Sequence, residues 1–126
     1  MYGGNSSERE ISLISGINVG EALVAKNHKV DYIDTRNVKH LKKLFTKKYD
    51  IAYIALHGRG GEDGAIQGLL ETINLKYTGS KIHASARCIN KADTKSIYDR
   101  YGITNAPYVV VQKGKDKDNK ETESWH

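Results

Sequence analysis

The run DIAYIAL at residues 50–56 is the feature that most constrains the fold of this chain. After its first residue it is continuously apolar and has the length of a β-strand, which is typical of a central parallel strand buried on both faces. Such a strand requires helices on both faces of its sheet. Because helical and extended patterns alternate along the rest of the sequence, we expect an α/β fold with a doubly wound, mostly parallel sheet.

The expected elements begin with a helix that starts near Ser6 or Ser7 and runs to about Lys26. Two overlapping capping boxes support its start, Asn5 with Glu8 and Ser7 with Glu10. The later elements are a strand at 30–34, a lysine-rich helix after it, the strand at 50–56, a helix at 65–73, a strand at 75–78, helices at 80–88 and 91–102, and a strand at 106–112. Only Met1 and Tyr2 precede the first glycine turn, so we expect the first strand to be largely missing, since a buried strand usually needs about five residues.

Length and composition indicate one modest domain. We place it at residues 1–112 and expect the charged, aperiodic stretch 113–126 to be a disordered tail or a severed linker. With 38% hydrophobic and 28% charged residues and no apolar stretch long enough to cross a bilayer, the composition is that of a soluble globular protein. No secretory signal is visible at the start, so we expect a cytoplasmic protein without a membrane partner.

The net charge of +5 does not indicate a nucleic-acid partner. Lysines cluster strongly only in residues 37–49, where they surround apolar residues at helical spacing, as on a solvated helix face. The sequence has no aromatic RNA-binding motif and no zinc-finger spacing, so we expect no nucleic-acid binding. The single cysteine, Cys88, has no partner for an internal disulfide and is expected to be a small buried hydrophobe.

Two glycine-rich stretches follow expected strands, YGGNSSE at residues 2–8 and HGRGGEDG at residues 57–64. Both fall at the carboxyl edge of the expected sheet, where open α/β folds bind their ligands. Neither stretch matches a nucleotide-binding fingerprint. The candidates at this edge are Glu8, which either holds a substrate ammonium or stabilises the helix start, and His57, which is either functional or a satisfied structural histidine.

Two further pairs of charged residues have competing interpretations. Glu62 and Asp63 are adjacent in a loop, and neighbouring side chains point in different directions, so we expect turn or cap hydrogen bonds there and no metal site. Lys91 and Lys95 lie four residues apart on an expected helix and can share a face. They are either cations that reach phosphates or solvated surface lysines.

Three separated motifs occur in the order GGNSSEREISLISG, IALHGRGGEDGAIQGLLE and YTGS, the last followed by a helix and Lys91. Together they resemble the N-terminal domain of bacterial D-alanine-D-alanine ligases, enzymes of the ATP-grasp superfamily, over roughly residues 2–112. The resemblance implies a Rossmann-like, pre-ATP-grasp domain of an enzyme that makes D-Ala-D-Ala for peptidoglycan. In that family ATP with Mg²⁺ phosphorylates one D-alanine carboxylate, and the amine of a second D-alanine attacks the acylphosphate. The resemblance also implies a homodimer for a full-length member.

The same resemblance carries site residues over by motif. Glu8, in SSERE, would bind the ammonium of the first D-alanine and is the catalytic candidate, and His57, in ALHG, would line the same subsite. Lys91 would match the lysine of the family's Met-Asp-Lys segment that reaches the ATP phosphates, although the segment here is Ile89-Asn90-Lys91. The residue types suit these roles, because a carboxylate pairs with an ammonium and a lysine neutralises phosphate charge.

The family continues into central and C-terminal ATP-grasp domains that have no counterpart in these motifs. We therefore expect a truncated chain that is inactive alone, with the magnesium ligands outside it. Two alternatives remain open. One is a non-catalytic α/β interaction or regulatory domain derived from a ligase, and the other is a different ATP-grasp carboxylate-amine ligase.

Overall fold

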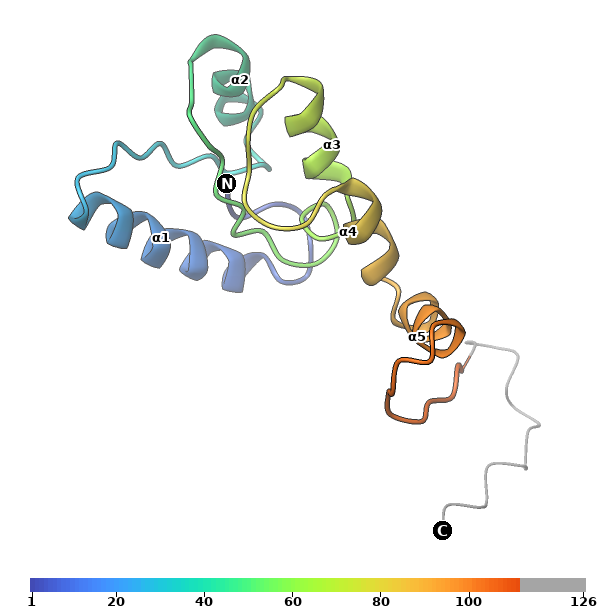
Figure 1. Ribbon diagram of the computed structural model, residues 1–126. Helices are drawn as coiled ribbons and strands as arrows, with labels where there is room; N and C mark the ends of the chain where they lie inside the picture. Colours follow the sequence, from blue (N-terminus) through green and yellow to red (C-terminus); the bar gives the residue numbers. More distant parts are fainter. Residues whose placement is uncertain (112–126) are drawn as a thin grey trace. The chain divides into compact units, whose positions relative to one another are not determined.

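The computed structural model describes residues 1–111 and has five helices in that part of the chain (Figure 1). They are α1 (Arg9–Ala25), α2 (Val38–Thr46), α3 (Ala65–Thr72), α4 (Ile82–Cys88) and α5 (Lys91–Arg100). All the helices expected from the sequence are therefore confirmed. The chain divides into two compact units, Met1–Lys91 and a second that begins at Ala92. The stretch 113–126, for which we expect a disordered tail, lies outside the described residues.

Helix α1 begins later than the capping boxes predict. Its N-cap residue is Glu8, whose side chain makes no capping hydrogen bond, and the Glu8 N–H donates to Ser6 Oγ at 3.2 Å. Both predicted capping boxes are therefore wrong. The reason is tertiary, because the Ser6 hydroxyl also donates to the His57 carbonyl oxygen at 2.8 Å and holds residues 5–8 in bends and turns ahead of the helix.

The amino terminus lies between two extended segments, one after α1 and one after α2 (Figure 1). On one side, the backbone of Tyr2 donates to and accepts from residues 33–35, at N···O distances of 3.0 and 3.2 Å. On the other side, the Met1 nitrogen donates to the Tyr53 carbonyl oxygen at 2.6 Å, and the Met1 carbonyl oxygen accepts the Ala55 N–H at 2.9 Å. A residue that bonds to two partners spaced two apart has the hydrogen-bond pattern of parallel strands. Met1 and Tyr2 thus lie at the centre of a parallel arrangement.

A further extended segment joins on the far side of residues 52–55. Ala52 donates its N–H to residue 76 at 2.7 Å and accepts the N–H of residue 78 at 3.1 Å. The spatial order is therefore 33–35, 1–2, 52–55 and 76–78, with all four segments parallel. The pairings of Tyr2 with Asp34 and of Ala52 with Tyr77 are isolated bridges. Residues 1–111 contain no regular strand, so the expected sheet stays a prediction.

The expected last strand, at 106–112, also does not form in the part of it that is described. Residues 106–111 form no strand and are all exposed. Strands are stabilised by pairing with a neighbour and by burial of one face, and these residues have neither among those described. The prediction of a strand at 106–111 is therefore wrong for this structure.

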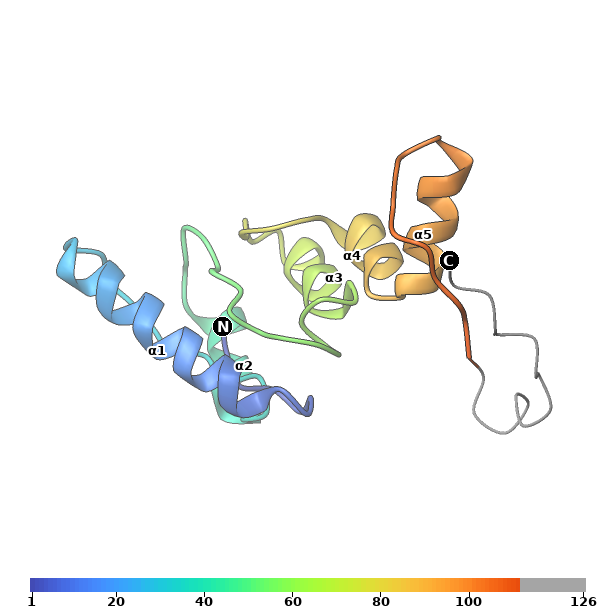
Figure 2. The ribbon, with the colours of Figure 1, turned by 90° about the horizontal axis from the view of Figure 1, so that it is seen from below.

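The core of the first unit lies where α3 covers the segment 52–56. Leu70 of α3 is fully buried and packs with Ile66, Ala52 and Leu56. Helix α3 starts after Gly64, whose φ of +93° is one that residues other than glycine rarely adopt. Helix α4 lies beside α3 in both views of the chain (Figures 1 and 2). This packing fixes both ends of the glycine-rich loop 57–64.

The surface partly follows the sequence predictions. The lysines of α2 are exposed apart from the partly covered Lys43, and Leu44 is the buried residue of that helix. Cys88, expected to be buried, is exposed, because the short helix α4 buries only Ser85. Among residues 1–111, no helix combines the length and the apolar character that crossing a membrane requires.

Candidate functional site

Ser12 fastens helix α1 to the glycine turn and to the segment before His57. Its side chain is fully buried. The hydroxyl accepts the Gly3 N–H at 2.8 Å and donates to the Ala55 carbonyl oxygen at 2.7 Å. A buried hydroxyl that both donates and accepts restrains the two backbone groups that it joins. The start of α1 therefore lies against the end of the segment that leads to His57.

Glu8 and His57 lie at this junction. The Glu8 Oε1 atom stands 2.9 Å from the point where a Cβ on Gly58 would lie, and Gly58 itself has a φ of +65°. A glycine is thus favoured there both by the backbone conformation and by the nearby carboxylate. The ring of His57 is half-buried, and its Nε2 lies 3.1 Å from Ser15 Oγ. The structure brings together the two candidates that come from separate motifs.

The side chains of Glu8 and His57 differ in whether their polar groups already have a partner in the protein. Glu8 is exposed, and its carboxylate makes no hydrogen bond or ion pair among the described residues. The imidazole of His57 is instead oriented by the Ser15 hydroxyl. An unpaired carboxylate can accept charge-assisted hydrogen bonds from an ammonium, and an oriented imidazole can form a second polar contact. The junction can therefore bind a small molecule that carries an amino group.

An ion pair that the motifs do not reveal stabilises the glycine turn at Gly3 and Gly4. Arg9 donates two hydrogen bonds to the Asp34 carboxylate, at 3.0 and 2.7 Å, and the two side chains are 23% and 15% exposed. Arg9 also donates to the Gly4 carbonyl oxygen at 3.0 Å. The hydrogen bond from Arg9 lowers the pKa of Asp34 to about 2, against the opposing effect of burial. One feature of the sequence could have indicated this ion pair. Asp34 ends an expected strand, at the same expected edge of the sheet as the glycine turn.

Glu62 and Asp63 make the turn hydrogen bonds that the sequence predicts. The Gly58 N–H donates to Glu62 Oε2 at 2.9 Å. The Gly60 N–H donates to Asp63 Oδ2 at 2.8 Å and lowers the pKa of that carboxyl group. Asp63 also accepts the Ala65 N–H, at 3.1 Å, where α3 begins. The part of the chain that the structure describes has no group of three or more His, Cys, Asp or Glu residues that could hold a metal ion.

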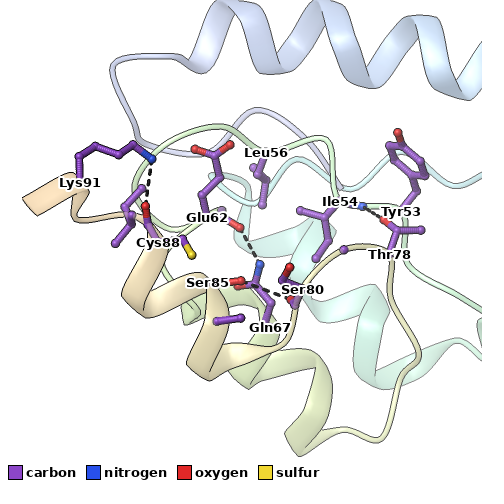
Figure 3. A pocket seen from close by; sticks show the side chains of 14 residues that line it. Tyr53, Ile54, Leu56, Glu62, Gln67, Thr78, Ser80, Ser85, Cys88 and Lys91 are labelled. Carbon is purple, nitrogen blue, oxygen red and sulfur yellow. Dashed lines mark hydrogen bonds between the residues drawn. The ribbon is translucent and has the colours of Figure 1, made fainter. Parts of the chain in front are cut away.

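Lys91 lies at a different place, on a cavity of about 490 Å³ whose walls come from residues 53–62, α3 and residues 78–91 (Figure 3). Its ammonium donates to the Cys88 carbonyl oxygen at 2.9 Å. Neither of the two candidates at the α1 junction lines this cavity. Lys91 therefore does not share this cavity with Glu8 and His57.

The same cavity contains Gln67, a residue that sequence reasoning missed (Figure 3). Gln67 is buried and donates from Nε2 to the Gly61 carbonyl oxygen at 2.8 Å. Its Oε1 is also buried, and it has no hydrogen-bond partner among the described residues. A buried acceptor without a partner is costly, so this amide is an unusual feature of the cavity wall. No motif distinguishes it from the polar residues on the outer face of a helix.

Lys95 belongs to the second unit and is engaged there. Its Nζ donates to the Ala106 carbonyl oxygen at 2.8 Å and to Asn105 Oδ1 at 3.2 Å. It also lies 5.0 Å from the centre of the Tyr108 ring, at cation–π distance. These contacts favour a structural role for Lys95 within that unit.

Comparison with known proteins agrees with the resemblance in the motifs. A family model described as D-ala D-ala ligase N-terminus matches residues 34–80. The D-alanine-D-alanine ligase of Pelotomaculum thermopropionicum is 45% identical over 113 residues, which are 90% of this chain and 35% of the relative. That of Trichlorobacter lovleyi is 45% identical over 121 residues, which are 96% of this chain and 38% of the relative. The chain thus spans little more than a third of the length of these relatives.

Solved structures lead to the same family. A D-alanine-D-alanine ligase from Bacillus anthracis complexed with ATP aligns with a TM-score of 0.77 at 32% identity, over 95% of this chain and 41% of that chain. The ligase from Aeromonas hydrophila aligns with a TM-score of 0.74 at 29% identity, over 86% of this chain and 42% of that chain. Over nine tenths of its length, the chain is therefore homologous to the N-terminal part of the D-alanine-D-alanine ligases.

Proposed function

We propose that this chain forms the part of an ATP-dependent D-alanine-D-alanine ligase that binds the first D-alanine. The observation that carries the proposal is the junction of α1 with the loop 57–64, where the Glu8 carboxylate is unpaired and the His57 ring is held by Ser15. A free amino acid carries an ammonium and a carboxylate. If Glu8 holds the ammonium, the D-alanine carboxylate stays available for phosphorylation.

ATP is the proposed second substrate, and Lys91 is the residue that we assign to its phosphates. The match to a ligase solved with ATP supports ATP as the substrate. The assignment of Lys91 follows the resemblance of its segment to the lysine segment of that family. The Lys91 ammonium is exposed and uses one of its three N–H donors, on the Cys88 carbonyl oxygen. Mg²⁺ accompanies ATP in this proposal, and its ligands would come from outside the described residues.

We further propose that this chain does not form the dipeptide by itself, because it spans only 35–38% of the relatives that it matches. The groups that transfer the phosphoryl group would lie in the rest of a complete ligase. Such a ligase would act in the cytoplasm, where it would supply D-Ala-D-Ala for peptidoglycan, and it would be a homodimer.

Titration of the 126-residue chain with D-alanine, followed by NMR, tests the assignment of Glu8. We expect saturable shifts at the start of α1 and in the loop 57–64, and smaller shifts with L-alanine. Glu8→Gln removes the charge that pairs with the ammonium, so it should weaken binding about 10- to 100-fold. The matched control is Glu10→Gln, which changes another exposed acid in the first turn of α1. Equal effects of the two substitutions would refute the assignment.

Phosphate release from Mg-ATP in the presence of D-alanine tests the inactivity of the isolated chain. We expect no release above background, and sustained turnover would contradict the proposal. The titration with D-alanine and the assay with Mg-ATP also distinguish the alternative functions. A regulatory domain would bind neither D-alanine nor ATP, and a different carboxylate-amine ligase would bind another amino acid more tightly than D-alanine.

A further inference from the structure

The segment around helix α2 carries a concentrated positive charge. Residues 36–48 contain six lysine and arginine residues and no acid, whereas the whole chain has a net charge of +5. The rest of the chain is therefore close to neutral. Among the described residues, only one of these six cations has an ion-pair partner, Lys47, which pairs with Asp31 at 2.8 Å. The charge of this segment is therefore largely uncompensated.

The apolar side of α2 is only partly covered by the protein. Leu44 is buried and Leu41 is half-buried, but the residues Val38 and Phe45 are 65% and 64% exposed. Seven residues complete almost two turns of an α-helix, so Val38 and Phe45 lie on the same side of α2. Two apolar side chains therefore line up in solvent along one side of this helix.

Lysines flank the apolar pair. Lys42 follows Val38 by four residues and precedes Phe45 by three, so it is a neighbour of both on the helix surface. Lys39 is also exposed. A lysine can lay its apolar stem along such neighbours and extend its ammonium beyond them. The surface formed by Val38, Lys39, Lys42 and Phe45, which we call the α2 face, therefore combines apolar groups with positive charge.

The composition of the α2 face favours a lipid surface over a protein or a nucleic acid. Protein interfaces are depleted in lysine and enriched in arginine and large aromatic residues. Contacts to the backbone of duplex nucleic acid are mainly electrostatic and leave exposed valine and phenylalanine side chains without a partner. An anionic bilayer uses both kinds of group, because its surface attracts lysines and its acyl boundary accepts apolar side chains.

We propose that the α2 face is a peripheral docking surface for an anionic lipid bilayer. Val38 and Phe45 enter the interfacial region, and the ammonium groups of Lys39 and Lys42 lie at the lipid phosphates. Contact of this kind needs no membrane-spanning helix, so the proposal revises the expectation of a protein without a membrane partner. It is independent of the proposed binding of D-alanine, which uses residues outside α2.

Flotation of the 126-residue chain with vesicles tests the proposal. We expect binding to vesicles of equal parts phosphatidylglycerol and phosphatidylcholine, and at least about 10-fold weaker binding to phosphatidylcholine alone. Raising the salt from about 0.1 M to about 1 M shortens the Debye length from about 10 Å to about 3 Å, so it should weaken binding to the anionic vesicles about 10-fold. Equal binding to both kinds of vesicle, or binding to neither, would overturn the proposal.

An exchange of apolar residues locates the contact. Phe45→Ser should weaken binding to the anionic vesicles about 10-fold, and Phe45→Trp should retain it, because tryptophan also suits the membrane interface. The control Ile14→Ser removes a side chain on α1 that is 58% exposed, and it should leave binding unchanged. Equal effects of Phe45→Ser and Ile14→Ser would refute a contact through the α2 face.

An exchange of lysines separates the α2 face from the net charge of the chain. Lys39→Gln combined with Lys42→Gln should weaken binding about 10-fold. Lys76→Gln combined with Lys81→Gln removes the same charge from two exposed lysines elsewhere and should weaken it about 2-fold or less. Equal losses from the two pairs would overturn the proposal. So would tighter binding to a single-stranded oligonucleotide than to the anionic vesicles, undiminished by Phe45→Ser, because that would identify a general polyanion surface.

Two further measurements make these outcomes decisive. Far-ultraviolet circular dichroism of each variant shows that it keeps its helices, so a loss of binding reports on the surface and not on unfolding. The D-alanine titration is carried out without vesicles, and we expect Phe45→Ser to leave it unchanged. Failure of vesicle binding therefore leaves the assignment of Glu8 standing, and failure of D-alanine binding leaves the α2 face standing.

Discussion

Replacement of Asp34 by asparagine removes the charge that anchors Arg9 and the glycine turn while it preserves the shape of the side chain. In the native chain the Arg9 hydrogen bonds lower the pKa of Asp34 from an ordinary 3.8 to about 2. A shift of this size corresponds to about 2 kcal/mol of stability. Both side chains keep some contact with solvent, which screens their attraction, so we expect Asp34→Asn to cost about 1 to 2 kcal/mol near pH 7.

The pH dependence identifies the source of this loss. Because the native pKa is lowered, the contribution of Asp34 is fully present above about pH 4 and disappears as the pH falls toward about 2. The stability difference between the native chain and Asp34→Asn should therefore be largest near neutral pH and should nearly vanish near pH 2. Urea unfolding followed by far-ultraviolet circular dichroism measures it.

A matched control is Asp31→Asn. Asp31 also accepts a hydrogen bond from a lysine, Lys47, at 2.8 Å, but this pair is more exposed, at 32% and 53% of the side chains. Exposed ion pairs contribute little, so we expect a loss below about 1 kcal/mol. If Asp34→Asn is no more costly than Asp31→Asn, or if its cost is the same at low and neutral pH, the assigned role of the Arg9–Asp34 pair is wrong.

The remaining predictions concern packing. Ser12→Ala should lower the free energy of unfolding by about 1 to 3 kcal/mol, because it leaves two buried backbone groups without partners, and denaturant unfolding measures the loss. Leu70→Ala should cost about 2 to 5 kcal/mol by opening a cavity at a fully buried side chain, and a loss below about 1 kcal/mol would argue against a packed core. Gly61→Ala should cost about 1 to 3 kcal/mol, because the new Cβ would lie 3.0 Å from the carbonyl carbon of Leu56, and a neutral effect in thermal melting would show that the loop 57–64 moves freely.

The helices of this protein were predictable because their signals are local. All five helices were expected from the sequence, and the turn hydrogen bonds of Glu62 and Asp63 followed from their place in a glycine-rich loop. The similarity to the ligase family was also present in three short motifs. The chemical roles of Glu8, His57 and Lys91 remain proposals, since they depend on ligands as well as on the positions that the structure describes.

The wrong prediction for the start of α1 has a tertiary cause, which is a contact between residues far apart in the sequence. The capping boxes failed because the Ser6 hydroxyl bonds to a carbonyl group 51 residues away, which delays the start of α1 to Arg9. The strand pairing expected from the sequence is present only as two isolated bridges, Tyr2 with Asp34 and Ala52 with Tyr77. A strand ladder depends on the pairing residues of both neighbouring segments, and the local propensity of one segment does not specify them.

The sequence by itself determined the helical elements, the turn hydrogen bonds of Glu62 and Asp63 and the similarity to the ligases. Only the tertiary structure decided that Glu8 lies over Gly58 beside His57, that Arg9 pairs with Asp34 across 25 residues, and that Ser12 joins α1 to Gly3 and Ala55. Periodicity and turn composition act within a few residues along the chain. Ion pairs, buried hydroxyl contacts and grooves depend on the packing of distant segments, so they exist only once the chain has folded.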